Sequence, residues 1–290
     1  MANIKELKKK IKSTKGTLKI TQAMKLVSAA KLAKAQVAIQ SSRPYADELE
    51  ETIKVISALV QDYKHAYLEE DIENKFSVLL VISADKGLCG GYNSRLSKKV
   101  VRFVKEKEDE ELKVFYIGKK VKDSIGSQLN SNKLFSFEGL EPTFSELSDI
   151  AEELAELFST AEVGRIYVAY NIFESAIAFE PTVKMILPMV LEEAEKNELS
   201  EKYPFDFKYE PNASVILDTL IPEVYMTTLQ TCMLNALASE HGSRMSSMDS
   251  AVTNCKDAIR SLTIKMNKLR QAAITTELIE VVSGAESLNG

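Results

Sequence analysis

The nine residues from Asp85 to Asn93 come closest to a chemical site in this sequence. They read Asp-Lys-Gly-Leu-Cys-Gly-Gly-Tyr-Asn and follow the apolar run Phe76–Ile82 almost directly. A glycine-rich loop between a buried strand and a helix is where α/β domains bind phosphate groups, because backbone N–H groups can approach the anion there. The glycines at 87, 90 and 91 fit neither the Gly-Lys-Ser/Thr of a P-loop nor the G-x-G-x-x-G pattern. The spacing therefore favours a tight turn or a partner-contact loop over phosphate binding.

Other candidate chemistry in the sequence is weak. Cys89 lies in the loop, but His65 and His241 are the only histidines and both fall in or beside helical segments. The three cysteines have neither metal-ligand nor redox spacing, which predicts reduced structural thiols. No carboxylate pair, metal-ligand cluster or catalytic triad stands out. The sequence predicts no catalytic, metal or cofactor residue.

Charge is distributed unevenly along the chain. The formal net charge is −5, yet residues 1–40 contain ten lysines and a single acid, Glu6. Such a basic segment suggests an anionic partner, which could be nucleic acid, a membrane surface or an acidic protein face. A solvated helix face explains the same pattern. The lack of aromatic residues between these lysines weakens the nucleic-acid alternative.

The last seventy residues show the strongest periodicity. From Met245 to Ala273 the apolar positions alternate in steps of three and four, which predicts a coiled-coil helix. The frame then slips by one residue at Ile274. We expect this helix to begin near Pro222. The polar residues near its end, among them Gln271, Thr275 and Glu277, either contact another protein or form a solvated face.

The N-terminal segment is the expected partner of that helix. Residues 3–40 have helical spacing, and Pro44 is expected to kink or break the helix near Ser41 before the pattern resumes to about Val60. Two long amphipathic helices at opposite ends of one chain favour an antiparallel hairpin, with a dimeric coiled coil as the alternative. The sequence thus predicts helical segments at 1–60 and 220–290 around an inserted domain at 75–210.

The insert alternates strand and helix patterns. Apolar runs predict strands at 76–82, 112–117, 165–170 and 181–187, and helices are expected at 93–107, 121–129 and 145–160. The strand–helix alternation predicts a doubly wound, Rossmann-like α/β domain.

Three separate motifs, in order along the whole chain, resemble the gamma-subunit family of F-type ATP synthases. The first is Ile20–Leu32 followed by Ser42–Ala46, and the second is the loop Asp85–Asn93. The third runs through Ala238–Met248, Asn267–Leu278 and Val282–Ala285. The resemblance implies an antiparallel coiled coil that turns inside a ring of alpha and beta subunits. Because the frame slips where the family signature begins, the C-terminal helix is expected to run on past its partner beyond about residue 273 and to be enclosed by the ring. The chain would be a non-catalytic shaft that couples ion flow to ATP synthesis, with no nucleotide, cofactor or small-molecule substrate of its own and no nucleic-acid partner.

The resemblance also implies contact residues and a location. The family positions that face the beta subunits fall on Met24, Lys25, Arg244, Gln271, Thr275 and Glu277. Lys86 and Gly87 match a segment near the rim of the ring, although arginine is more usual in the family where Lys86 stands. The inserted domain would contact an epsilon-type subunit and the membrane c-ring. The N-terminus lacks the composition of a transit peptide, so the cytoplasmic face of a bacterial inner membrane is expected.

Overall fold

A computed structural model describes residues 2–60, 63–129, 131–135, 143–190, 198–199, 201–203 and 207–289. The chain divides into two compact units. The helical unit consists of Met1–Ala29 and Arg244–Gly290, and the sheet unit consists of Ala30–Ser243. Two long helices, α1 (Ala2–Leu59) and α6 (Ala213–Asn289), contribute to both units.

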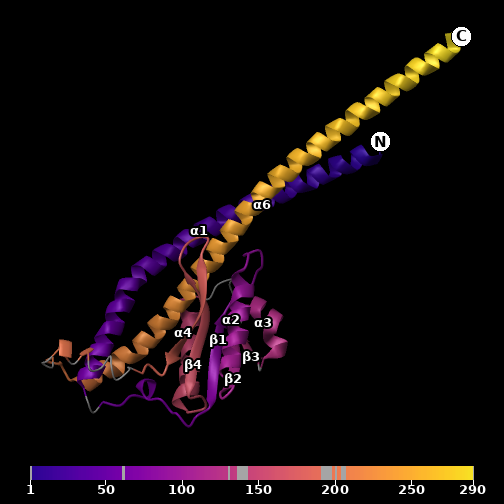
Figure 1. Cartoon of the computed structure of the whole chain (residues 1–290). Coiled ribbons are helices and arrows are strands. Elements are labelled where there is room, and N and C mark those ends of the chain that lie inside the picture. The colour runs from indigo at the N-terminus through magenta and orange to yellow at the C-terminus, as the bar shows by residue number, and fades with distance from the viewer. Residues whose placement is uncertain are drawn as a thin grey trace. The chain divides into compact units, whose positions relative to one another are not determined.

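The sheet unit is built on a five-stranded mixed sheet with the order β3-β2-β1-β4-β5 (Figure 1). The neighbours β1, β2, β3 and β4 pair in parallel, whereas β5 pairs antiparallel with β4. The strands are β1 (Phe76–Ile82), β2 (Glu111–Ile117), β3 (Ser131–Phe135), β4 (Arg165–Phe173) and β5 (Phe179–Leu187).

The doubly wound fold expected from the sequence is confirmed. One edge of the sheet has an additional strand, β3, and the strand expected at 181–187 is β5, which is antiparallel at the other edge. Strand β3 was not anticipated, because Ser-Asn-Lys-Leu-Phe lacks a continuous apolar run. Strand β5 is antiparallel because only residues 174–178 separate it from β4. A parallel return needs a crossover of about a dozen residues or more, so this short connection can only form a hairpin.

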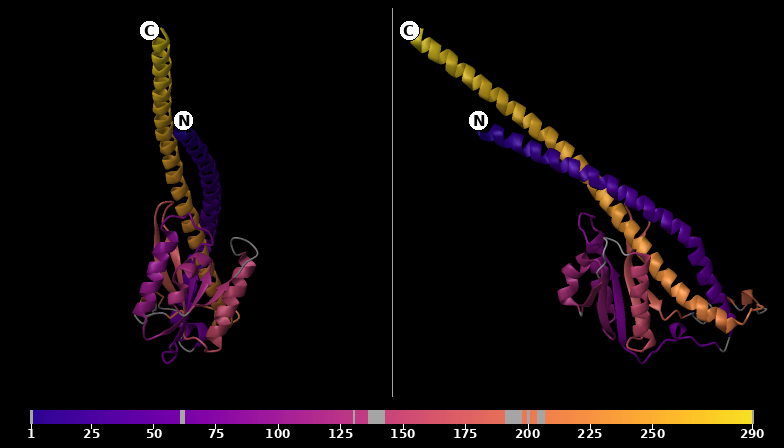
Figure 2. Two further views of the ribbon diagram at one scale, coloured as in Figure 1. Left: turned by 90° about the vertical axis from the view of Figure 1, so that its right-hand side faces the viewer. Right: turned by 180° about the vertical axis from the view of Figure 1, so that it is seen from behind.

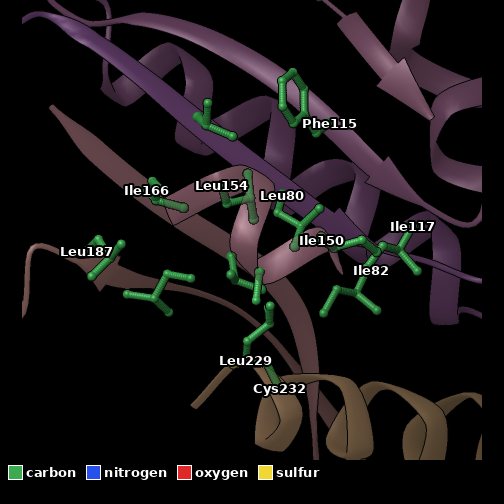
Figure 3. Close-up of a cluster of buried hydrophobic side chains, with 14 of the residues drawn as sticks. Leu80, Ile82, Phe115, Ile117, Ile150, Leu154, Ile166, Leu187, Leu229 and Cys232 are labelled. Atoms are coloured by element: carbon green, nitrogen blue, oxygen red, sulfur yellow. The ribbon is translucent and has the colours of Figure 1, made fainter. Parts of the chain in front are cut away.

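Helices cover both faces of the sheet. The helices α2 (Tyr92–Glu106) and α3 (Lys119–Ile125) lie on one face, where they pack on alternate strand residues such as Leu79 and Val81. On the other face, Leu80 and Ile82 pack against α4 and against the part of α6 around Leu229 (Figure 3). The central strands are therefore buried on both sides, which explains why β1 is apolar at every position except Ser77.

The helix α4 (Phe144–Ser159) begins where its sequence predicts. The Thr143 hydroxyl accepts a hydrogen bond from the Glu146 N–H, and the Glu146 carboxylate accepts one from the Thr143 N–H. This reciprocal capping box satisfies backbone donors at the start of the helix. Two short 3-10 turns, η1 (Ala66–Leu68) and η2 (Gly126–Gln128), complete the described elements.

Two sequence-based boundaries were wrong. Of the kink or break expected near Ser41, the break is wrong, because α1 is helical through Pro44, and α6 begins at Ala213 with Pro222 inside it rather than at its start. Both proline rings are exposed. Apolar residues next to them anchor the helices: Leu49, Ile53 and Ile56 of α1 pack in one cluster with Leu217, Ile221 and Val224 of α6. This tertiary packing outweighs the loss of one backbone hydrogen bond at each proline.

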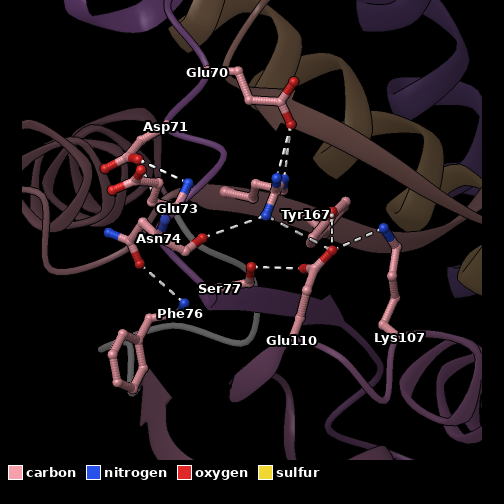
Figure 4. A network of polar contacts seen from close by, with 10 residues as sticks. Glu70, Asp71, Glu73, Asn74, Phe76, Ser77, Lys107, Glu110 and Tyr167 are labelled. Atoms are coloured by element: carbon pink, nitrogen blue, oxygen red, sulfur yellow. Dashed lines mark hydrogen bonds and ion pairs between the residues drawn. The ribbon is translucent and has the colours of Figure 1, made fainter.

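A polar network ties together the amino ends of the strands (Figure 4). The Glu110 carboxylate accepts hydrogen bonds from the Ser77 hydroxyl at 2.7 Å and from the Lys107 ammonium at 2.8 Å. The Arg165 guanidinium lies 2.9 Å from the Glu70 carboxylate and 3.9 Å from that of Glu110. The network links β1, β4 and the residues just before β2. It therefore stabilises the amino-terminal end of the sheet, which is opposite the end where the glycine loop lies.

Candidate functional site

The helical unit is an antiparallel pair of helices, and one ion pair between them shows how they are aligned. The Lys25 ammonium of α1 lies 2.5 Å from the Asp249 carboxylate of α6. Moving 23 residues back to Ala2 moves the same number forward along α6, so the start of α1 lies opposite about residue 272. Figure 2 shows the same result, with α6 extending beyond the N-terminal end of α1. The expectation that the C-terminal helix outruns its partner is confirmed.

The part of α6 that extends past α1, residues 274–285, is named here the overhang. Each of its side chains is exposed in this chain. Five of them are large and apolar, with exposed fractions of 49–70%: Ile274, Leu278, Ile279, Val281 and Val282. A contiguous apolar surface of this kind marks a protein–protein contact rather than a solvated helix face.

The predicted site residues near the overhang do not share one face. Gln271 and Thr275 are exposed and one turn apart, and the Thr275 hydroxyl donates to the Gln271 carbonyl at 3.0 Å. Leu278 and Val282 continue that side of the helix at spacings of seven and eleven residues from Gln271. Glu277 is also exposed, but it lies about 200° further round the helix than Thr275. Gln271 and Thr275 therefore present one surface, and Glu277 presents another.

Met24 and Lys25 lie on α1 in the helical unit, and both are half-buried. Ile20 and Val27 are 62% and 58% exposed and share the side of α1 that carries Met24. These two residues were missed as contact candidates. Their signal in the sequence is that both fall outside the apolar spacing that runs from Ile4 to Leu18.

Arg244 differs from the other predicted contact residues because it is only 8% exposed. Most of its surface is therefore covered within this chain. It is the first residue of the helical unit on α6. The solvent exposure of the predicted contact residues therefore differs widely: Arg244 is buried, whereas Gln271, Thr275 and Glu277 are exposed.

The glycine loop folds inward at Cys89 and outward at its tip. The Cys89 side chain is 2% exposed and accepts a hydrogen bond from the Asn93 amide at 3.2 Å. The Cys89 carbonyl accepts one from the Ser243 hydroxyl of α6 at 2.5 Å. Tyr92, which opens α2, is also buried and packs with Cys89 in a small apolar cluster. Cys89 therefore anchors the loop, which fits the expectation of a structural thiol.

The tip of the loop presents Lys86, Gly87 and Leu88. Lys86 is exposed, and no atom lies within 4 Å of the place where a Cβ of Gly87 would stand. Leu88 is 63% exposed and has a positive φ of 62°. That conformation is uncommon for a leucine, and it holds an apolar side chain outward. The geometry supports a partner-contact loop, with Leu88 as a residue that sequence reasoning missed.

The remaining thiols and polar clusters are structural in character. Burial raises the pKa of the Cys232 thiol to about 11, so it stays protonated at neutral pH. Within the residues that the structure describes, no three His, Cys, Asp or Glu side chains are grouped as they would be around a metal ion. Among the same residues, no helix is long and apolar enough to cross a membrane.

The sequence matches the ATP synthase family over residues 3–288. It is 37% identical over 292 residues to the ATP synthase gamma chain of Geobacter metallireducens, covering all of both chains. It is 38% identical over 288 residues to the ATP synthase gamma chain of Brevibacillus brevis, covering 98% of each.

Two solved structures share the fold at lower identity. A chain of the Euglena gracilis mitochondrial ATP synthase, in a structure of its OSCP, F1 and c-ring, aligns with a TM-score of 0.68 and 20% identity. The alignment covers 99% of this chain and 95% of that one. A chain of the central stalk and c-ring of the Tetrahymena thermophila enzyme aligns with a TM-score of 0.56 and 22% identity, covering 80% and 99%.

Proposed function

Because the chain belongs to the ATP synthase gamma-chain family, we propose that it is the central rotating shaft of an F-type ATP synthase. It carries out no chemistry itself. It couples ion flow through a membrane rotor ring to ATP synthesis or hydrolysis on the surrounding beta subunits.

The observation that carries this proposal is the overhang. Five large apolar side chains on one continuous helix stand exposed where α1 no longer covers α6. A chain that folds alone gains nothing from such a surface, whereas a ring that encloses the helix end would bury it. The exposed Ile20 and Val27 on α1 support the same interpretation.

The proposed mechanism is a shift in populations that the shaft imposes by turning. The end of α6 is asymmetric, because Gln271 and the overhang residues Thr275 and Leu278 lie on one side of the helix and Glu277 lies on another. Each beta subunit in a ring therefore meets a different surface at any moment. A surface that binds one conformation of a beta subunit better than another biases that subunit's equilibrium by the difference in binding free energy. Rotation moves this bias from one catalytic site to the next.

The proposed partners follow from the parts of the chain. Alpha and beta subunits would contact Met24, Lys25, Arg244, Gln271, Thr275 and Glu277, together with Lys86 and Gly87 at the loop tip. The insert at 75–210, between helical segments 1–60 and 220–290, would bind an epsilon-type subunit and the membrane c-ring. We place the assembly at the cytoplasmic face of the cell inner membrane, with this chain as a peripheral component.

Co-purification tests the proposal directly. The chain is co-expressed with the alpha and beta subunits, and the tag is placed on the beta subunit. We expect this chain to elute with both subunits and the assembly to hydrolyse ATP, while the purified chain alone shows no turnover. Turnover by the chain alone, or elution of the ring without it, would overturn the assignment.

A charge at Met24 tests the contact on α1. Met24→Lys places a second ammonium beside Lys25 on a half-buried surface. We expect proton pumping per ATP hydrolysed to fall in membrane vesicles, while the thermal unfolding midpoint of the isolated chain changes little. Lys19→Gln, on an exposed position of the same helix, is the control. Unchanged coupling in Met24→Lys would remove Met24 from the contact set.

A further inference from the structure

A groove lies between α2 and α3 of the sheet unit. The two helices lie side by side on one face of the sheet (Figure 1). The groove between them has a volume of about 610 Å³. Residues of α2 line it at spacings of three and four, and the end of α3 with η2 closes it. Its lining includes Ser97, Lys98, Val101, Arg102, Lys105 and Ile125.

The floor of this groove contains a hydroxyl group without a partner. Ser97 is 6% exposed, and its Oγ forms no hydrogen bond with any residue that the structure describes. Leaving a buried hydroxyl unsatisfied costs roughly 1–3 kcal/mol. The Oγ itself has less than 1 Å² of accessible surface, although the residue lines the groove. A turn of the Ser97 side chain about χ1 toward the groove lets the hydroxyl donate to a ligand and removes that cost.

Three basic side chains of α2, those of Lys98, Arg102 and Lys105, line the same groove as Ser97, together with the acid Glu106. Arg102 pairs with Glu106 at 2.6 Å, whereas Lys98 and Lys105 make no ion pair with a described residue. Helix α2 carries five basic residues and one acid, and α3 carries three and one. Helix α4, on the opposite face of the sheet, carries five acids and no basic residue. The electrostatic potential of the α2–α3 face is therefore strongly positive, and it attracts anions to this face.

The apolar side chains that line the groove indicate which kind of anion fits it. Val101 and Ile125 form part of the groove next to the charged side chains. A bare inorganic ion leaves these side chains in contact with water, whereas an organic group attached to the anion covers them. Lysine and arginine with a hydroxyl donor are the groups that proteins use for phosphate oxygens.

We propose that the α2–α3 groove binds a phosphate ester whose organic part is apolar. The phosphate accepts a hydrogen bond from Ser97 and lies between Lys98, Arg102 and Lys105. The organic part rests on Val101 and Ile125. Such a group is found both in small soluble esters and in the headgroup region of an acidic phospholipid, and the experiment separates these two sources.

The test measures binding by the purified full chain. Titration calorimetry uses phenyl phosphate against inorganic phosphate, and sedimentation uses phosphatidylglycerol vesicles against phosphatidylcholine vesicles. We expect phenyl phosphate to bind more tightly than inorganic phosphate, or phosphatidylglycerol vesicles alone to bind the chain. Raising the salt concentration weakens either interaction, because exposed charges contribute to it.

Substitutions locate the binding in this groove. Lys98→Gln and Ser97→Ala are each expected to weaken it roughly tenfold, since each removes one hydrogen bond to a charged group. Lys99→Gln is the matched control, because it removes the same charge from the neighbouring exposed position on α2, which does not line the groove. Glu106→Gln is expected to tighten binding several-fold, because it releases Arg102 from its ion pair.

Each outcome decides the matter. Sensitivity of phenyl phosphate binding to Lys98 and Ser97 supports a soluble ester, and sensitivity of vesicle binding alone supports a phospholipid. The proposal is overturned when neither probe binds, or when Lys99→Gln weakens binding as much as Lys98→Gln. The measurement needs no ring subunits, so its result is independent of the proposed shaft function.

Discussion

Helix α6 uses the same residue types in two opposite ways. In the sheet unit Leu217, Ile221 and Leu229 are each 0% exposed. In the overhang Leu278 and Val281 are 60% and 70% exposed. Both stretches are helical and both carry large aliphatic side chains, so the difference lies in what faces them. An apolar pattern shows that a helix needs a partner, and it does not say whether that partner belongs to the same chain.

This difference separates stability from assembly. Buried aliphatic side chains of the sheet unit contribute to the folding free energy of the chain, at about 25 cal/mol per Å² of apolar surface removed from water. Aliphatic side chains of the overhang contribute little until a partner covers them. Substitutions in the sheet unit should therefore lower the free energy of unfolding of the chain, whereas substitutions in the overhang should weaken its association with partners.

The sharpest contrast is between two glycines. Gly118 has a φ of 82°, and a Cβ there would lie 2.0 Å from the Ser83 carbonyl oxygen, whereas a Cβ at Gly284 meets no atom within 4 Å. We expect Gly118→Ala to lower the free energy of unfolding by more than about 3 kcal/mol, because backbone must move to relieve the clash. Gly284→Ala should leave it unchanged or slightly raised, since alanine favours helix.

Urea denaturation followed by circular dichroism measures both variants. Should Gly118→Ala prove too unstable to purify, its soluble fraction relative to Gly284→Ala gives the same ranking. Equal stabilities would show that the close approach of Gly118 to β1 is not maintained in solution.

A pair of leucines gives the next largest effect. Leu229→Ala removes a fully buried side chain from the core that α6 shares with the sheet, and a loss of about 2–5 kcal/mol is expected. Leu278→Ala should change the free energy of unfolding of the isolated chain by less than about 0.5 kcal/mol. The order should reverse in assembly, where Leu278→Ala weakens association with the alpha and beta subunits.

Chemical denaturation of the isolated chain and competitive co-purification with the ring subunits provide the two readouts. A destabilised Leu278→Ala chain would mean that the overhang packs against its own chain, which contradicts the comparison of the two stretches.

The sequence was enough to predict the elements whose signals are local. The strand pattern at 76–82, the heptads from Met245 to Ala273 and the helical pattern at 145–160 each predicted the element that the structure contains. Strand β3 and the continuity of α1 through Pro44 could not be read in this way. The first is completed by pairing with β2, and the second by packing of Leu49 and Ile53 on α6. Both depend on contacts distant in sequence.

The residues of the candidate site also differ in how far the sequence could predict them. The overrun of α6 past α1 was predicted from the family resemblance together with the frame slip at Ile274, and the structure confirms it. The contact role of Gln271, Thr275 and Glu277 came from a family resemblance, and it stays a prediction. Leu88 was missed because its outward position depends on a positive φ, and a leucine in the sequence does not predict a positive φ.

The polar network of the sheet unit predicts a pH dependence that the helical unit lacks. Burial raises the pKa of Glu110, but hydrogen bonds from Lys107 and Ser77 and the charges of Lys107 and Arg165 outweigh it, so this pKa is lowered from its ordinary 4.5. A depressed pKa contributes stability above the unfolded-state pKa, and that contribution is lost as the pH falls through the folded-state pKa.

We therefore expect Glu110→Gln to lower the free energy of unfolding by about 1–3 kcal/mol at pH 7, with the difference from the unmodified chain shrinking as the pH falls below 4.5. Glu6 also has a lowered pKa, through a hydrogen bond from Lys10 and the charge of Lys10, but this pair is fully exposed to solvent. Glu6→Gln is the matched control and should leave stability unchanged at both pH values. A pH-independent difference for Glu110→Gln would show that its charge is not what matters.

The smallest effect is expected at the ion pair that aligns the helical unit. Lys25 and Asp249 are in contact, but their side chains are 41% and 58% exposed, so water already solvates both charges. A double-mutant cycle of Lys25→Gln and Asp249→Asn should give a coupling free energy of about 0.2–1 kcal/mol that decreases as salt is added. The alignment of α1 with α6 then rests mainly on buried residues such as Leu7, Met248 and Val252. A coupling free energy well above that range would mean that the pair is more desolvated in solution than its exposure indicates. The alignment, and with it the length of the overhang, would then depend on salt and pH.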